Sequence, residues 1–168
     1  MTMSNHTRRF FAAAGGIAVL GALLGRRGAV AATDPAAGAA YPVHHTEAEW
    51  RKLLSPAAFD VLREQGTEMP WSSPLLHVSG PGRFACAGCA RPLFDTATKF
   101  DSGTGWPSFW QPLPDAVGRS DDNSLMMSRT EVHCAGCGGH LGHVFDDGPK
   151  PTGLRYCMNG VAMTFAKA

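Results

Sequence analysis

Two copies of the motif Cys-Ala-Gly-Cys constrain the fold of this chain more than any other feature. The first copy contains Cys86 and Cys89, and the second contains Cys134 and Cys137. Two cysteines separated by two residues can direct both thiolates from one tight turn toward the same ion. Two such turns supply the four ligands of a tetrahedral site, for which zinc is the usual metal. We therefore expect one structural zinc ion per chain, bound by these four cysteines.

A pair of disulfides is the alternative use of the same cysteines, because an exported protein meets an oxidising environment. A disulfide within Cys-x-x-Cys closes a very small loop and constrains the unfolded chain little. A shared zinc ion instead joins two segments that are far apart in the sequence. This difference favours zinc.

Residues 1–31 have the organisation of a cleavable signal peptide. Arg8 and Arg9 precede an uncharged apolar run from Phe10 to Gly25, and small residues follow it. An arginine pair in this place is typical of the twin-arginine signal, which predicts export of the folded protein to the periplasm. A general secretory signal is one alternative. A membrane anchor is another, although the run is shorter than the roughly 20 apolar residues that span a bilayer.

The remaining residues are enough for one domain. Residues 32–45 lack hydrophobic periodicity and predict a flexible lead, whereas residues 46–168 have the length of a single domain. Removal of the signal removes four arginines and no other charged residue, which changes the formal net charge from +1 to −3. Because no basic run remains, we expect no nucleic acid partner. We also expect a monomer without stable membrane association after cleavage.

Two short helices are expected at the start of the domain, followed by β structure. Thr46 and Glu49 have the spacing of a capping box, and Ser55 begins a second helix that should end at Gly66. Beyond Gly66, short apolar segments alternate with turns rich in glycine and proline, which predicts mostly strands. The expected strands include residues 83–86, 124–134, 141–147 and 161–168.

The fifth cysteine, Cys157, lies in the segment Arg-Tyr-Cys-Met-Asn-Gly, outside the paired motifs. A cysteine left over from a paired set is either a core residue or a reactive thiol. The thiolate is the reactive form, and a nearby cation or hydrogen-bond donor lowers the pKa of a cysteine. Arg155 and Asn159 are groups of this kind. The residue types alone leave both interpretations of Cys157 open.

Five segments together resemble the methionine-R-sulfoxide reductases, the B type of peptide-methionine sulfoxide reductase. They are GTEMPWS, CAGCARPLF, KFDSGTGWPSFW, RTEVHCAGCGGHLGHVFDDGP and TGLRYCMNGVAMTF, and they occur in the order of that family. The resemblance covers nearly all of residues 46–165. It implies a mainly β fold in which two antiparallel sheets form an open, tent-like barrel, with short N-terminal helices and a four-cysteine zinc site away from the reaction centre.

The resemblance also implies roles for individual residues. Cys157 would be the nucleophile that attacks the sulfur of methionine-R-sulfoxide in proteins and becomes a sulfenic acid. His143 and Asn159 would belong to the catalytic site, with His143 protonating the departing oxygen directly or through water. Trp106 would form an apolar wall for the substrate methyl group. His140 is a candidate substrate-binding residue, with a structural role as the alternative.

Thr104 departs from the pattern of the family, because many members have a resolving cysteine at this position. We therefore expect the sulfenic acid to be recycled by an external thiol, either a small thiol or a thioredoxin-like protein, during repair of oxidised exported proteins. The family often has a histidine near residues 123–127, and its absence here leaves the identity of the proton donor open.

Two other functions compete with reduction of methionine sulfoxide. A zinc-containing binding module would use neither Cys157 nor the histidines, and a thiol peroxidase would use Cys157 on peroxide. The intact segments around Cys157, His143 and Trp106 favour the sulfoxide reductase over a binding module, which has no need to retain them together.

Overall fold

The structure is a computed structural model that describes residues 41–124 and 127–168. The predicted signal peptide, residues 1–31, lies outside the described residues, as does most of the predicted lead. Within the two described ranges, every helix is too short or too polar to cross a membrane.

Two short helices begin where the sequence predicts them. Helix α1 (Glu47–Leu53) starts with the reciprocal capping box: the Glu49 N–H donates to Thr46 Oγ1 at 3.3 Å, and the Thr46 N–H donates to the Glu49 carboxylate at 2.8 Å. Helix α2 (Pro56–Glu64) starts at Ser55, whose side chain accepts the Ala58 N–H.

Helix α2 ends at Glu64, shortly before the glycine that was expected to stop it. Gln65 adopts a left-handed conformation with φ of 58°, and the next N–H, of Gly66, turns back to donate to the Asp60 carbonyl at 2.9 Å. This arrangement is a common way to satisfy the last carbonyls of a helix.

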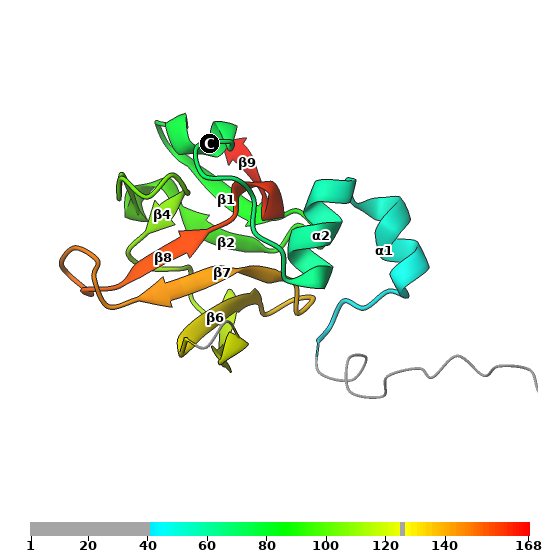
Figure 1. Ribbon diagram of the computed structural model, residues 1–168. Helices are drawn as coiled ribbons and strands as arrows, with labels where there is room; N and C mark the ends of the chain where they lie inside the picture. Colours follow the sequence, from blue (N-terminus) through cyan, green and yellow to red (C-terminus); the bar gives the residue numbers. More distant parts are fainter. Residues whose placement is uncertain (1–40, 125–126) are drawn as a thin grey trace, which may run out of the picture. The chain divides into compact units, whose positions relative to one another are not determined.

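Two antiparallel sheets confirm the predicted mainly β class (Figure 1). The smaller sheet has the order β2-β1-β9, and the larger has the order β3-β4-β8-β7-β6-β5. The strands are β1 (Gly82–Cys86), β2 (Pro92–Asp95), β3 (Lys99–Phe100), β4 (Ser108–Phe109), β5 (Val117–Asp122), β6 (Arg129–Cys134), β7 (His140–Phe145), β8 (Arg155–Met158) and β9 (Met163–Lys167). Short 3₁₀ turns η1 (Pro74–His77), η2 (Thr96–Thr98) and η4 (Gly160–Ala162) connect them.

The strand predicted at residues 124–134 is shorter in the structure and begins at Arg129. Ser124 belongs instead to the turn after β5, where its N–H donates to Asp122 Oδ1 at 2.9 Å. Strands β2, β3, β4 and β8 lie outside the four segments predicted from the sequence, and so does β5. This strand lies at the edge of the larger sheet and is largely exposed, so it lacks the apolar alternation of a half-buried strand.

Aromatic side chains pack the two sheets together. Phe84 of β1 and Phe94 of β2 contact Phe109 of β4, with ring centroids 4.9 and 4.3 Å apart. Tyr156 of β8 lies edge-on to Phe94 at 5.9 Å, and all four rings are buried. Close aromatic packing of this kind contributes more than its buried area alone. It fixes strand β8, which contains the fifth cysteine, and the neighbouring strand β4.

The first described residues already contact the domain. The Val43 N–H donates to the Gly136 carbonyl at 2.8 Å, and the Tyr41 ring meets the ring of His133 at a centroid distance of 5.7 Å. Residues before Thr46 therefore also contact the domain, including the loop between Cys134 and Cys137.

Candidate active site and zinc site

The four paired cysteines converge in the structure. Their sulfur atoms all lie within 4.8 Å of one another, and the Cys86–Cys137 and Cys89–Cys134 sulfur distances are 3.7 and 3.5 Å. Sulfur atoms bound to one tetrahedral zinc at about 2.3 Å lie about 3.8 Å apart, whereas a disulfide bond is about 2.05 Å long. None of the four forms a disulfide. The convergence of the four sulfur atoms fits zinc, so the predicted structural zinc site is confirmed.

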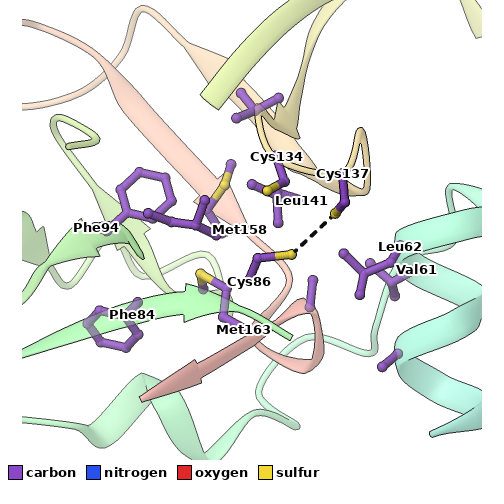
Figure 2. Packing of buried hydrophobic residues seen from close by; sticks show 14 of the residues in the cluster. Val61, Leu62, Phe84, Cys86, Phe94, Cys134, Cys137, Leu141, Met158 and Met163 are labelled. Carbon is purple, nitrogen blue, oxygen red and sulfur yellow. Dashed lines mark hydrogen bonds between the residues drawn. The ribbon is translucent and has the colours of Figure 1, made fainter. Parts of the chain in front are cut away.

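The surroundings of the sulfur atoms also suit bound thiolates. The backbone N–H groups of Gly88 and Gly136 donate to the sulfurs of Cys86 and Cys134, each at 3.3 Å. Hydrogen bonds of this kind orient the ligands and stabilise their negative charge. Figure 2 shows Cys86 and Cys137 directed toward each other at the border of the hydrophobic core. Because Cys86 ends a strand of the smaller sheet and Cys134 ends a strand of the larger, a zinc ion held by these cysteines would join the two sheets.

Cys157 lies in β8, between β4 and β7. The antiparallel register pairs it with Ser108 of β4 on one side and with His143 of β7 on the other. Gly142 permits this close approach of β7, because a Cβ atom at its position would lie 2.1 Å from the Cys157 carbonyl oxygen. The backbone pairing therefore holds a histidine beside the fifth cysteine.

A cavity of about 140 Å³ opens at Cys157. Given about 30 Å³ for each water molecule in the liquid, it has room for one side chain. Its lining residues are Thr67, Trp106, Arg129, Gly142, His143, Phe145, Cys157 and Asn159. The structure thus gathers four predicted site residues around one cavity. A hollow of about 930 Å³ beside β9 is larger but contains neither cysteine nor histidine, so its size alone does not make it the site.

A carboxylate orients His143. Its Nε2 atom lies 2.7 Å from Asp122 Oδ2, and the same oxygen accepts a hydrogen bond from Arg129 Nη2 at 2.6 Å. Hydrogen bonds from Ser124, and then from His143, hold the pKa of Asp122 well below its usual range.

Burial lowers the pKa of His143, and the hydrogen bond to Asp122 only partly opposes this effect. At neutral pH the ring is therefore neutral. Since Asp122 is an acceptor, Nε2 carries the proton, and Nδ1 is left as the acceptor atom. The imidazole can take up a proton at Nδ1 while Asp122 stabilises the resulting cation.

Asn159 is held at both ends of its side-chain amide. Its Oδ1 accepts the Glu68 N–H at 3.0 Å, and its Nδ2 donates to the Leu141 carbonyl at 3.1 Å. The residue is 4% exposed and lines the cavity. An amide group has two N–H donors, so one remains for a group bound beside Cys157.

Trp106 and Phe145 form the apolar walls of the cavity. The Trp106 Nε1–H donates to the Glu68 carbonyl at 3.1 Å. The Arg155 guanidinium covers the ring of Phe145 at 4.4 Å and is itself fixed by two hydrogen bonds of 2.8 Å to Asp147. Phe145 was not predicted as a site residue, although its position indicates this role: it lies two residues after His143 on β7, and such residues share a face of the sheet.

His140 lies apart from this cavity. It is 4% exposed, its Nδ1 atom lies 2.8 Å from Glu131 Oε1, and it lines an adjacent polar hollow together with His143 and Arg129. The structure therefore does not bring His140 together with Cys157, and its contact with substrate stays a prediction. Arg129 and Asp122 were not singled out in the sequence, because their relation to His143 depends on strand pairing.

Comparisons with known proteins provide further findings. The SelR domain family matches residues 54–167. Peptide methionine sulfoxide reductase MsrB from Agrobacterium fabrum is 52% identical over 124 residues, which are 73% of this chain and 92% of that protein. The MsrB protein of Leptospira interrogans is 48% identical over 128 residues, or 76% and 98% of the two chains. That of Bradyrhizobium diazoefficiens is 54% identical over 119 residues, or 70% and 86%.

Proposed function

Because the chain belongs to the SelR domain family and is a peptide methionine-R-sulfoxide reductase of the MsrB type, we propose that Cys157 is its nucleophile and His143 its proton carrier. One observation carries this assignment. Cys157 and His143 are paired across neighbouring strands and line one cavity, and a hydrogen bond between His143 Nε2 and Asp122 orients the imidazole. A nucleophile, a base and a group that orients the base form the usual arrangement for nucleophilic catalysis.

The reaction transfers one oxygen atom from the substrate sulfur to Cys157. His143 Nδ1 accepts the thiol proton, and the thiolate attacks the sulfoxide sulfur. This attack forms an S–S bond between Cys157 and the substrate, and protonated His143 returns the proton to the sulfoxide oxygen. The resulting hydroxyl group then moves from the substrate sulfur to Cys157 Sγ, so that the S–O and S–S bonds of the intermediate break as an S–O bond forms on Cys157. The substrate sulfur is reduced by two electrons to methionine, and Cys157 is oxidised by two electrons to a sulfenic acid.

The other cavity residues orient the substrate. Trp106 and Phe145 enclose its methyl group, and the remaining Asn159 N–H donates to the sulfoxide oxygen. With the methyl group and oxygen both fixed, one epimer directs its sulfur at Cys157. A site built to bind both groups excludes the other epimer by shape and by loss of the hydrogen bond.

Recycling requires an external thiol. A first thiol attacks the sulfenic acid, releases water and forms a mixed disulfide with Cys157, and a second thiol then releases the reduced enzyme. A small dithiol or a thioredoxin-like protein supplies both thiols. Zinc holds the other four cysteines and has a structural role.

The test is reduction of a peptide that contains methionine-R-sulfoxide, with dithiothreitol as the reductant. We expect turnover of the R epimer and none of the S epimer. Equal rates for the two epimers would contradict the proposed site. A parallel assay with hydrogen peroxide addresses the alternative of a thiol peroxidase, which would consume peroxide faster than sulfoxide.

We further propose that the enzyme acts on exported proteins in the periplasm. Support comes from the sequence of residues 1–31, in which Arg8 and Arg9 precede the apolar run. Export of the folded protein would also let zinc bind in the reducing cytoplasm before the cysteines meet oxidants. On this proposal the mature enzyme is a monomer without stable membrane association.

A further inference from the structure

We infer that Glu68 is a positioning residue of the reductase, which holds Trp106 and Asn159 in place by its backbone and caps the turn after Cys157 by its carboxylate. The inference rests on the proposed function of Cys157. Glu68 does not line the cavity itself, so it acts through the two residues that do.

The backbone of Glu68 contacts both sides of the site. Its carbonyl accepts the Trp106 indole N–H at 3.1 Å, and its N–H donates to Asn159 Oδ1 at 3.0 Å. One peptide segment therefore sets the orientation of the apolar wall and of the amide. A shift of this segment moves both groups together.

The carboxylate of Glu68 fixes that segment to the turn η4, which follows the nucleophile strand. One carboxylate oxygen accepts the Gly160 N–H at 2.5 Å, and the other accepts the Val161 N–H at 2.9 Å. Hydrogen bonds from N–H groups to an ionised carboxylate are about twice as strong as those between neutral groups.

Asn159 occupies the position from which a side chain would normally cap η4. Asparagine is among the preferred residues for this role, yet the Asn159 side chain makes no hydrogen bond to the turn. Glu68, from a distant part of the sequence, satisfies the turn instead. The Asn159 amide is thereby directed to the cavity side rather than to the backbone that follows it.

Close packing around Gly160 and Gly105 holds the segment that contains Glu68 in one position. A Cβ atom added to Gly160 would lie 1.9 Å from Ser73 Oγ and 3.3 Å from a Glu68 carboxylate oxygen. On the other side, the Trp71 N–H donates to the Gly105 carbonyl at 2.8 Å, next to Trp106. The segment that contains Glu68 therefore docks against the chain on both sides of the cavity.

Loss of the carboxylate should release Asn159 from its position. The N–H groups of Gly160 and Val161 would lose their acceptor, and the side chain of Asn159, which is at the N-cap position of this turn, could rotate to cap them. A misplacement of about 1 Å at a catalytic site can cost about 100-fold in rate. For Glu68→Ala we expect kcat/KM toward methionine-R-sulfoxide to fall about 10-fold to 100-fold. For Glu68→Gln the loss of kcat/KM should be smaller, because the glutamine side chain keeps one carbonyl oxygen as an acceptor.

The experiment compares Glu68→Ala and Glu68→Gln with wild type and with Glu47→Gln. Glu47 is a matched control because it lies on α1 and is highly exposed. Two quantities are measured: kcat and KM with a methionine-R-sulfoxide peptide, and the rate of Cys157 alkylation across a range of pH. A positioning role predicts a loss of kcat/KM with an unchanged alkylation profile, because Glu68 makes no contact with the thiol.

Two results would overturn the inference. Either kcat/KM stays within twofold of wild type in both variants, or alkylation falls in parallel with reduction, which would indicate general loss of structure. If the Glu68→Ala variant does not fold, the kcat/KM and alkylation profile of Glu68→Gln alone test the inference. A wild type inactive on the R epimer would overturn the proposed function and this inference with it, whereas an active wild type with unaffected variants would overturn the inference alone.

Discussion

The Thr104 hydroxyl lies 3.8 Å from the Cys157 thiol. Ser102 Oγ is 2.8 Å from this hydroxyl and 2.7 Å from Ser108 Oγ, so a row of hydroxyl groups lies beside the nucleophile. A thiol at position 104 would be placed to resolve the sulfenic acid, but a hydroxyl cannot do so. Since the other four cysteines converge on the zinc site, we expect the oxidised enzyme to be recycled by an external thiol.

Thr104→Cys should turn the one-cysteine enzyme into one that forms an internal disulfide. The two sulfur atoms would need to approach by only about 2 Å to reach bonding distance. After one turnover without reductant, intact mass should show loss of two hydrogens in the variant and gain of one oxygen in wild type. Thr104→Ser is the matched control and should retain the sulfenic acid. An internal disulfide in wild type would mean that a zinc ligand resolves Cys157.

Cys157→Ser should abolish reduction of methionine sulfoxide while leaving the fold intact. An alcohol is a far poorer nucleophile than a thiolate at neutral pH, so we expect a loss of at least about 1,000-fold in kcat/KM. Circular dichroism, thermal unfolding and zinc content should match those of wild type. Substantial activity in this variant would assign the nucleophile to another residue.

Cys134→Ser should unfold or aggregate the domain. Cys134 is fully buried and its sulfur lies 3.5 Å from that of Cys89. Binding of structural zinc contributes about 10 kcal/mol or more in small zinc peptides, and here the bound ion would join the two sheets. Elemental analysis of wild type should find about one zinc per chain. Fully active, metal-free protein with two disulfides would contradict this prediction.

Asp122→Asn should change the pH dependence of catalysis. In wild type, kcat/KM should fall at acidic pH, because on the proposed mechanism protonated His143 cannot accept the thiol proton. The hydrogen bond to Asp122 raises the pKa of His143 against the effect of burial. Loss of the carboxylate should lower that pKa further and move the acidic limb to lower pH. The maximal rate should also fall about 10-fold to 100-fold, because the ring loses its orientation.

The control for this prediction is Asp121→Asn, which changes an exposed carboxylate of the same strand. Its pH profile should coincide with that of wild type. An acidic limb that moves to higher pH in Asp122→Asn would show that Asp122 does not stabilise protonated His143.

Replacement of both Arg8 and Arg9 by lysine should leave unprocessed precursor in the cytoplasm. The charge of the segment is unchanged, but lysine does not reproduce the guanidinium groups that distinguish arginine in recognition. Cell fractionation with detection of precursor and mature protein measures the effect. Normal export of the double variant would indicate the general secretory route instead.

Local features of the fold could be predicted because their physical causes lie within a few residues. The Thr46–Glu49 capping box and the Ser55 cap satisfy backbone donors of their own helices, so spacing alone identifies them. The four zinc ligands were predictable for a similar reason, since each Cys-x-x-Cys turn already directs two sulfur atoms to one point. The edge strand β5 was not predictable, because an exposed edge leaves no hydrophobic pattern.

The site also has features that could be predicted from the sequence and features that could not. Motifs that resemble a known family were enough to predict the class of reaction and to identify Cys157 as the candidate nucleophile. The contacts of Asp122 with His143, of Phe145 with the cavity and of Glu68 with Asn159 became visible only in the folded domain. These relations depend on strand register and on the docking of distant segments. Packing of the whole domain sets the distances between side chains on different strands, and the spacing of residues along the chain does not determine these distances.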